Sequence, residues 1–161
     1  MISVRIIELL RIHNQNKYLL VVSELKEVEK EYELIVGKYE DKLVQWRRIN
    51  GECLSIVSRL DEKANELRVK DFLINFICLR RVKGIANKYQ EELDYLLCII
   101  NEIRQRIDDL RDKLAEAIYE QKGLEALKER VTNIKVKKLK KMYQKVLSDI
   151  NNLDYFIRDK Q

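Results

Sequence analysis

The sequence has 161 residues, of which 37% are charged and 46% hydrophobic, with four glycines and no proline. Strand-rich folds need turn residues every eight to twelve positions or so, and α/β enzymes need glycine-rich loops, so both classes are excluded. The 32 basic and 27 acidic residues leave a net charge of +5, too small to indicate nucleic acid or a membrane by itself. We therefore expect an all-α protein.

Apolar residues in the first half recur at alternating steps of three and four, the spacing of a helix that packs on another helix along a seam. This seam runs from Tyr18 to Tyr39, takes an extra step of four to Leu43, and continues to Leu67. Two successive steps of four are a stutter, which locally unwinds a supercoil. The first half is predicted to be one long helix.

The second half has a more regular seam. Ten consecutive seam positions from Ala86 to Ala117 are apolar. The spacing is lost near Gly123, recovers from Leu124 to Ile134, and shifts again before Leu139. Two long helices therefore account for nearly the whole chain.

A turn between the two helices is predicted near 80–85. Three cations, Arg80, Arg81 and Lys83, precede Gly84, and a helix C-terminus favours cations in its last turn and a glycine after it. The prediction is a long antiparallel two-helix coiled-coil hairpin that forms a single domain over 1–161. Its first arm covers about 2–82 and its second about 85–158.

A break at Asn50-Gly51 is the alternative, because this pair is typical of turns and would give a three-helix bundle. The seam, however, passes through Asn50 without a phase change, and a single Asn in a seam is a known register device. The hairpin is preferred.

Two features favour fold-back near 80–85. It would set Gly37 opposite Gly123, so that the stutter faces the register break. It would also bring residues 24–41, with seven acids and three lysines, across from 128–145, with eight cations and one acid. Opposite charges beside a seam select partner and orientation in coiled coils.

The segment FLINFICL at 72–79 is apolar on every face, and a two-helix hairpin can bury only one stripe. Either the segment packs locally, with a short third helix, or it is a docking surface for another protein. Phe72, Phe76 and Leu79 are the candidate contact residues.

The lysine-rich run NIKVKKLKKMYQK at 133–145 is a second candidate surface. It could be a solvated or paired helix face, contact an acidic protein, or bind nucleic acid or lipid. It contains no arginine, the usual bidentate reader of phosphates and bases, and the acidic stretch would offset much of its charge. Nucleic acid is therefore the less favoured partner.

No catalytic or cofactor motif is present. His13 is the only histidine, and Cys53, Cys78 and Cys98 have neither disulfide-framework nor zinc-ligand spacing. The longest apolar runs fall far short of the ~20 residues that span a membrane, and the N-terminus lacks a secretory signal. We expect a cytoplasmic, non-enzymatic protein without metal or cofactor.

The layout resembles that of the FliJ/YscO (SctO) family, the central stalk proteins of type III secretion and flagellar export. Three segments carry this resemblance: a helix that begins almost at once, a variable middle, and a charged second arm. They read RIIELLRIHNQNKYLLVVSELKEVEKEYE (5–33), SRLDEKANELRVKDFLINFICLRRVK (58–83) and NEIRQRIDDLRDKLAEAIYEQKGLEALKERV (101–131). The resemblance also allows an earlier turn, at 61–70.

The resemblance implies a partner for each end of the hairpin. The end with both termini would enter a hexameric export ATPase and promote its activity, and the middle or tip would contact the cytosolic ring of the export gate at the inner membrane. Secretion chaperones are further possible partners. On this basis the candidate residues facing the ATPase are Arg5, Arg11, Lys135, Lys137, Lys138, Lys140 and Lys141, and those facing the other partner are Phe72, Phe76 and Leu79. The alternatives are a basic helical nucleic-acid-binding protein acting through 133–145 and a structural coiled-coil adaptor.

Overall fold

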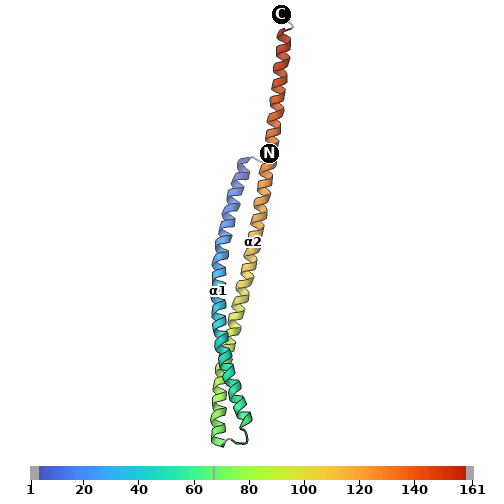
Figure 1. Ribbon diagram of the computed structural model, residues 1–161. Helices are drawn as coiled ribbons and strands as arrows, with labels where there is room; N and C mark the ends of the chain where they lie inside the picture. The colour runs from blue at the N-terminus through green and yellow to red at the C-terminus, as the bar shows by residue number, and fades with distance from the viewer. Residues whose placement is uncertain (1–3, 67, 159–161) are drawn as a thin grey trace. The chain divides into compact units, whose positions relative to one another are not determined.

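The computed structural model contains two helices, α1 (Val4–Glu62) and α2 (Val69–Arg158), packed against each other as a hairpin (Figure 1). The structure describes residues 4–66 and 68–158, with side chains as far as residue 152. The predicted all-α antiparallel hairpin is confirmed. Residues 2 and 3 of the predicted first arm lie outside the described residues.

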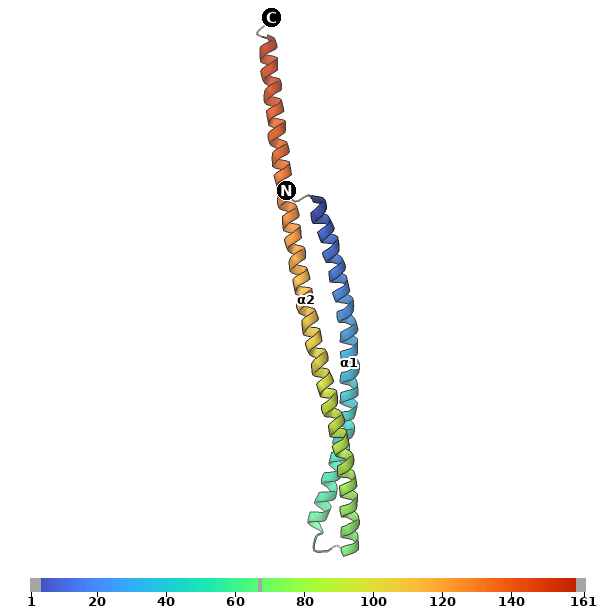
Figure 2. The same cartoon turned by 180° about the vertical axis from the view of Figure 1, so that it is seen from behind.

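The predicted turn at 80–85 is wrong, and with it the arm boundaries 2–82 and 85–158. The chain reverses between the end of α1 at Glu62 and the start of α2 at Val69, within the earlier alternative of 61–70 (Figure 2). The Arg68 carbonyl accepts a hydrogen bond from the Phe72 amide at 3.0 Å, which starts α2 as an N-cap carbonyl does. Gly84 lies inside α2 without a positive φ, so it caps no helix.

The alternative break at Asn50-Gly51 is not found, because α1 runs through both residues. The short third helix considered for 72–79 is not found either, since this segment belongs to α2.

The hairpin contacts fall into two compact units. One comprises Ser23–Arg111 and contains the turn; the other comprises Met1–Val22 with Asp112–Gln161. In the first unit the predicted seams are buried or half-buried over most of their length, but Val57 and Ala64 are exposed, and Leu67 lies outside the described residues. The buried apolar residues of this unit are Val28, Cys53, Leu60, Ala86, Leu93, Ile100, Ile103, Ile107 and Leu110. A repeat of three and four therefore buries one stripe of each helix.

Charged residues pair across the seam of Ser23–Arg111. Arg106 Nη2 lies 3.2 Å from Glu24 Oε1, and Arg111 Nη2 lies 3.5 Å from Glu29 Oε1. The acidic stretch of α1 thus meets arginines of α2 between 104 and 111. The predicted pairing of this stretch with the basic residues 128–145 is wrong, because the chain turns about 17 residues earlier than 80–85.

The second unit packs the start of α1 against α2. Ile7 and Ala117 are fully buried, and Asn14 is 4% exposed. Gly123 lines a groove of this unit with Leu10, His13 and Asn14, so the predicted pairing of Gly37 with Gly123 is also wrong.

Candidate interaction surfaces

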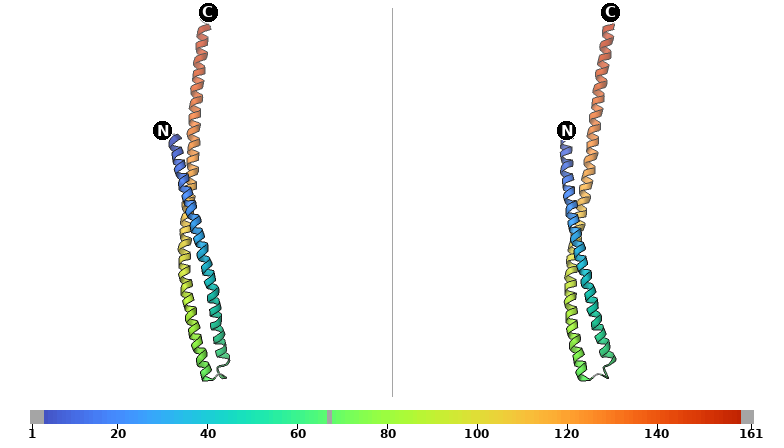
Figure 3. Two further views of the ribbon diagram at one scale, coloured as in Figure 1. Left: turned by 90° about the vertical axis from the view of Figure 1, so that its left-hand side faces the viewer. Right: turned by 60° about the vertical axis from the view of Figure 1, so that its left-hand side comes forward.

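The last part of α2 is exposed on all of its faces. Leu124, Leu127 and Val131 are half-buried against α1, whereas every residue from 132 to 152 is exposed. Figure 3 shows this orange and red part of α2 without α1 beside it in either view. Six lysines and one aspartate give 132–152 a net charge of +5. We call residues 132–152 the basic extension.

The predicted lysines all lie on the basic extension. Lys135, Lys137, Lys138, Lys140 and Lys141 are exposed, and within the described part of the chain none of them forms a hydrogen bond or ion pair. Their charge is therefore not offset by the acidic stretch of α1, contrary to the sequence expectation.

Arg5 and Arg11, the predicted candidates on α1, lie beside the last covered turns of α2. Arg5 is exposed, and Arg11 Nε lies 3.7 Å from Glu8 Oε1. Glu8 also accepts a hydrogen bond from Lys128 Nζ at 2.9 Å, and this bond lowers the pKa of the Glu8 carboxyl from its ordinary value. Arg11 and Lys128 thus both pair with Glu8. The predicted lysines of the basic extension have no such pair among the described residues.

The start of α2 forms an apolar surface in the Ser23–Arg111 unit. Phe72 and Phe76 are 40% and 52% exposed, while Leu79 is half-buried. Val69, Leu73, Ile74 and Ile77 are also exposed. Of the two interpretations of 72–79, exposure favours a docking surface for Phe72 and Phe76 and helix packing for Leu79.

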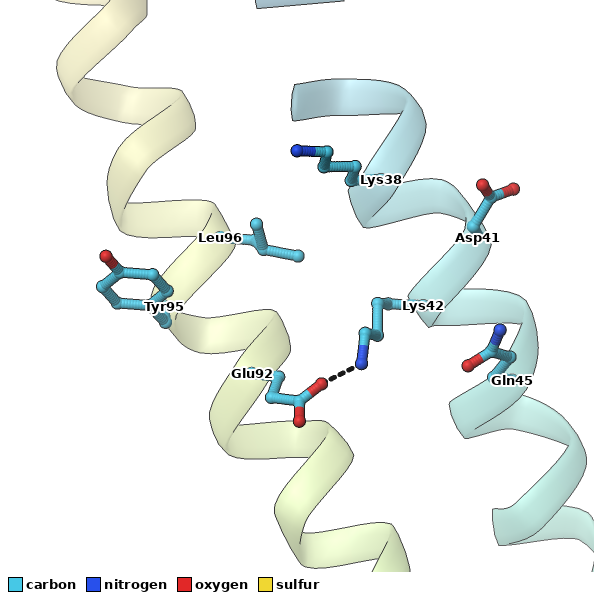
Figure 4. A pocket seen from close by; sticks show the side chains of 7 residues that line it. All are labelled: Lys38, Asp41, Lys42, Gln45, Glu92, Tyr95 and Leu96. Atoms are coloured by element: carbon cyan, nitrogen blue, oxygen red, sulfur yellow. Dashed lines mark hydrogen bonds and ion pairs between the residues drawn. The ribbon is translucent and has the colours of Figure 1, made fainter. Parts of the chain in front are cut away.

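A groove lies between α1 and α2 in the same unit (Figure 4). Its lining residues are Lys38, Asp41, Lys42, Gln45, Glu92, Tyr95 and Leu96. Lys42 Nζ donates a hydrogen bond to Glu92, and this bond raises the pKa of Lys42. The same Nζ atom lies 4.8 Å from the centre of the Tyr89 ring. The opposite charges of Lys42 and Glu92 bind each other, whereas Lys38 and Asp41 of the same lining form no ion pair among the described residues.

Metal ligands do not gather anywhere in the described ranges: no group of three or more His, Cys, Asp or Glu side chains could hold an ion. Cys53 is buried, and Cys78 and Cys98 are exposed free thiols. In the same ranges neither helix has a stretch apolar enough to cross a bilayer.

Two features were not recognised from the sequence. Asn14 is buried in the seam, and its Nδ2 donates to the Ala117 carbonyl at 2.9 Å. The apolar residues of the basic extension, from Val136 to Ile150, are exposed, although their spacing of three and four had suggested a seam covered by the other arm. Only the position of the turn reveals that α1 does not reach them.

Comparisons with known proteins identify no family. No family model matches the chain, and no solved structure is significantly similar to it. A protein of Aquifex aeolicus (strain VF5), named only as an uncharacterized protein, is 27% identical over 117 residues. The match covers 73% of this chain and 40% of the length of that relative. The resemblance to the FliJ/YscO family is not tested by these comparisons and stays a prediction.

Proposed function

We propose that this chain is a non-enzymatic stalk protein of a bacterial type III secretion export apparatus. In this role the unit that contains the start of α1 and the basic extension enters the hexameric export ATPase and promotes its activity, and the exposed Phe72 and Phe76 contact the export gate. The protein would act in the cytoplasm, at the inner-membrane base of the apparatus, where secretion chaperones are further candidate partners.

One observation carries the proposal: a helical hairpin ends in a basic extension whose lysines are unpaired among the described residues. Unpaired lysines on one helix raise the local concentration of an acidic partner and speed its association. The family resemblance supplies the identity of that partner, the acidic loops of the ATPase pore.

Reversal of charge on the outer face of the extension tests the proposal. The triple variant Lys137→Glu, Lys138→Glu, Lys141→Glu should lose most of its stimulation of the purified export ATPase, measured as phosphate release at low salt. The matched control reverses Lys88, Lys113 and Lys122, which are exposed on the same helix but outside the extension. Equal stimulation by the two triple variants would remove the charge argument.

Nucleic-acid binding through 133–145 is a second candidate, favoured by the finding that the lysines are not offset by the acidic stretch. If up to six lysines contact phosphates of duplex DNA, the logarithm of the binding constant should fall with the logarithm of the salt concentration, with a slope no steeper than about −5. A gel-shift titration at several salt concentrations measures this slope. Binding that is absent at low salt, or unchanged in the Lys137/Lys138/Lys141 variant, contradicts this candidate.

A further inference from the structure

The basic extension carries an apolar stripe that nothing in the described chain covers. Val136, Leu139, Tyr143, Val146 and Ile150 follow one another at steps of three, four, three and four, and their exposed fractions lie between 44% and 67%. Met142 and Leu147, also exposed, widen the stripe on its two sides. The stripe points away from Lys137 and Lys141, because successive residues of a helix are rotated by about 100°.

The spacing of the stripe is that of a helix–helix seam. A strict seven-residue repeat drifts by about 20° per heptad on a straight helix, and supercoiling around a second helix removes this drift. A helix lying on a membrane has no such partner and follows the 3.6-residue period. Val136 and Ile150 are β-branched and Leu139 follows Val136, as in two-stranded coiled coils, whereas Tyr143 and Val146 depart from that pattern.

The stripe is not a continuation of the face that α1 covers. The covered face of α2 runs through Leu124, Leu127 and Val131, and its alternating steps continue through Ile134 and Lys138. The stripe is displaced from this line by one or two residues, which is at least about 100° around the helix. A helix collinear with α1 would therefore meet Ile134 and then lysines, and the stripe requires a separate helix.

Charge decides which helix could occupy it. Five positions flank the stripe: Lys135 and Lys140 are basic, Asp149 is acidic, and Met142 and Leu147 are apolar. The flanks toward the start of the stripe are therefore positive, and flanking charges select the partner of a coiled coil. A second copy of the extension would bring +5 against +5. The start of α1 is also unsuitable as the partner helix, because residues 4–22 carry three cations and one acid. Lys135 and Lys140 instead complement Asp or Glu residues on a partner helix.

We infer that the apolar stripe binds an amphipathic helix of another protein, with a heptad apolar seam and acidic residues flanking that seam. This inference goes beyond the proposed function, since it concerns the face of α2 opposite Lys137 and Lys141 and requires neither an ATPase nor secretion. The partner helix forms a two-stranded coiled coil with α2 from residue 136 to at least 150.

The test uses the full chain and a synthetic three-heptad peptide that has Ile and Leu at its seam positions and Glu at both flanking positions. Titration calorimetry should give one peptide per chain. Leu139→Asp should weaken binding by about tenfold or more, because burial of one leucine side chain contributes at least that factor. The matched control is Ile134→Asp, at an apolar residue that is 53% exposed, against 65% for Leu139, and that lies about 200° around the helix from Val136. This variant should bind as the unchanged chain does.

A charge exchange tests the flanking lysines separately. The variant Lys135→Glu, Lys140→Glu should prefer a peptide with Lys at the flanking positions over the Glu peptide, reversing the order seen with the unchanged chain. Far-ultraviolet circular dichroism checks that each variant keeps its helix content. The Lys137/Lys138/Lys141 variant should retain the stripe, so failure here and failure of the proposed function are distinguishable.

Four results would overturn the inference. They are failure of the unchanged chain to bind the Glu peptide, equal binding by Leu139→Asp and Ile134→Asp, a dimer in sedimentation that Leu139→Asp dissociates, and binding to phosphatidylserine vesicles that Leu139→Asp abolishes. The third result would assign the stripe to a second copy, and the fourth to a lipid surface.

Discussion

Asn14 restricts how the start of α1 pairs with α2 in the unit of Met1–Val22 with Asp112–Gln161. It is 4% exposed, its Nδ2 donates to the Ala117 carbonyl, and its Oδ1 has no hydrogen-bond partner among the described residues. An unsatisfied buried acceptor costs about 1–3 kcal/mol, yet a polar residue at one seam position fixes register. Asn14 therefore lowers stability and raises specificity.

Replacement of Asn14 by Leu should make the chain more stable by about 1 kcal/mol, because an unsatisfied polar group is exchanged for an apolar one. The free energy of unfolding in urea measures this gain, and Asn16→Leu, on the exposed side of the same helix, is the control. The register should become less well defined, which disulfide trapping of Glu8→Cys with Lys128→Cys would reveal as a lower yield. A loss of stability in Asn14→Leu would contradict this account.

Burial along each helix could be predicted from the sequence, because a seam repeats every seven residues whatever its partner is. Every one of the ten predicted seam positions from Ala86 to Ala117 is buried or half-buried. The turn could not be predicted, since residues 63–66 contain neither glycine nor proline, while Arg80 to Gly84 imitates a helix end. Register depends on the turn, so the predicted opposite pairs failed with it.

Gly84 provides a direct test of the turn at the scale of the helix. It lies inside α2, has no positive φ, and a Cβ built there meets nothing within 4 Å. Gly84→Ala should therefore stabilise the chain by about 0.5–1 kcal/mol, because alanine loses less backbone entropy than glycine in a helix. If Gly84 stood in a left-handed helix cap, Gly84→Ala would instead destabilise the chain. Thermal unfolding distinguishes the two, with Gly51→Ala as the control inside α1.

Charge is distributed unevenly over the molecule. In the Ser23–Arg111 unit, acids of α1 pair with arginines of α2, as Glu24 does with Arg106. In the other unit, the basic extension holds +5, which equals the net charge of the whole chain. The lysines of the basic extension could therefore be predicted from the sequence. Their lack of acidic neighbours could not, because it depends on which residues the turn brings together.

The exposed position of residues 132–152 also has an energetic consequence for the helix itself. Between Leu79 and Val131, packing against α1 holds the backbone of α2 in its helical conformation, whereas here the conformation depends on residue propensity and on continuity with the covered turns. A partner on the stripe would therefore supply both contacts and helix stability. Amide protection of these residues should rise with the partner's concentration, so that recognition and local folding become a single equilibrium.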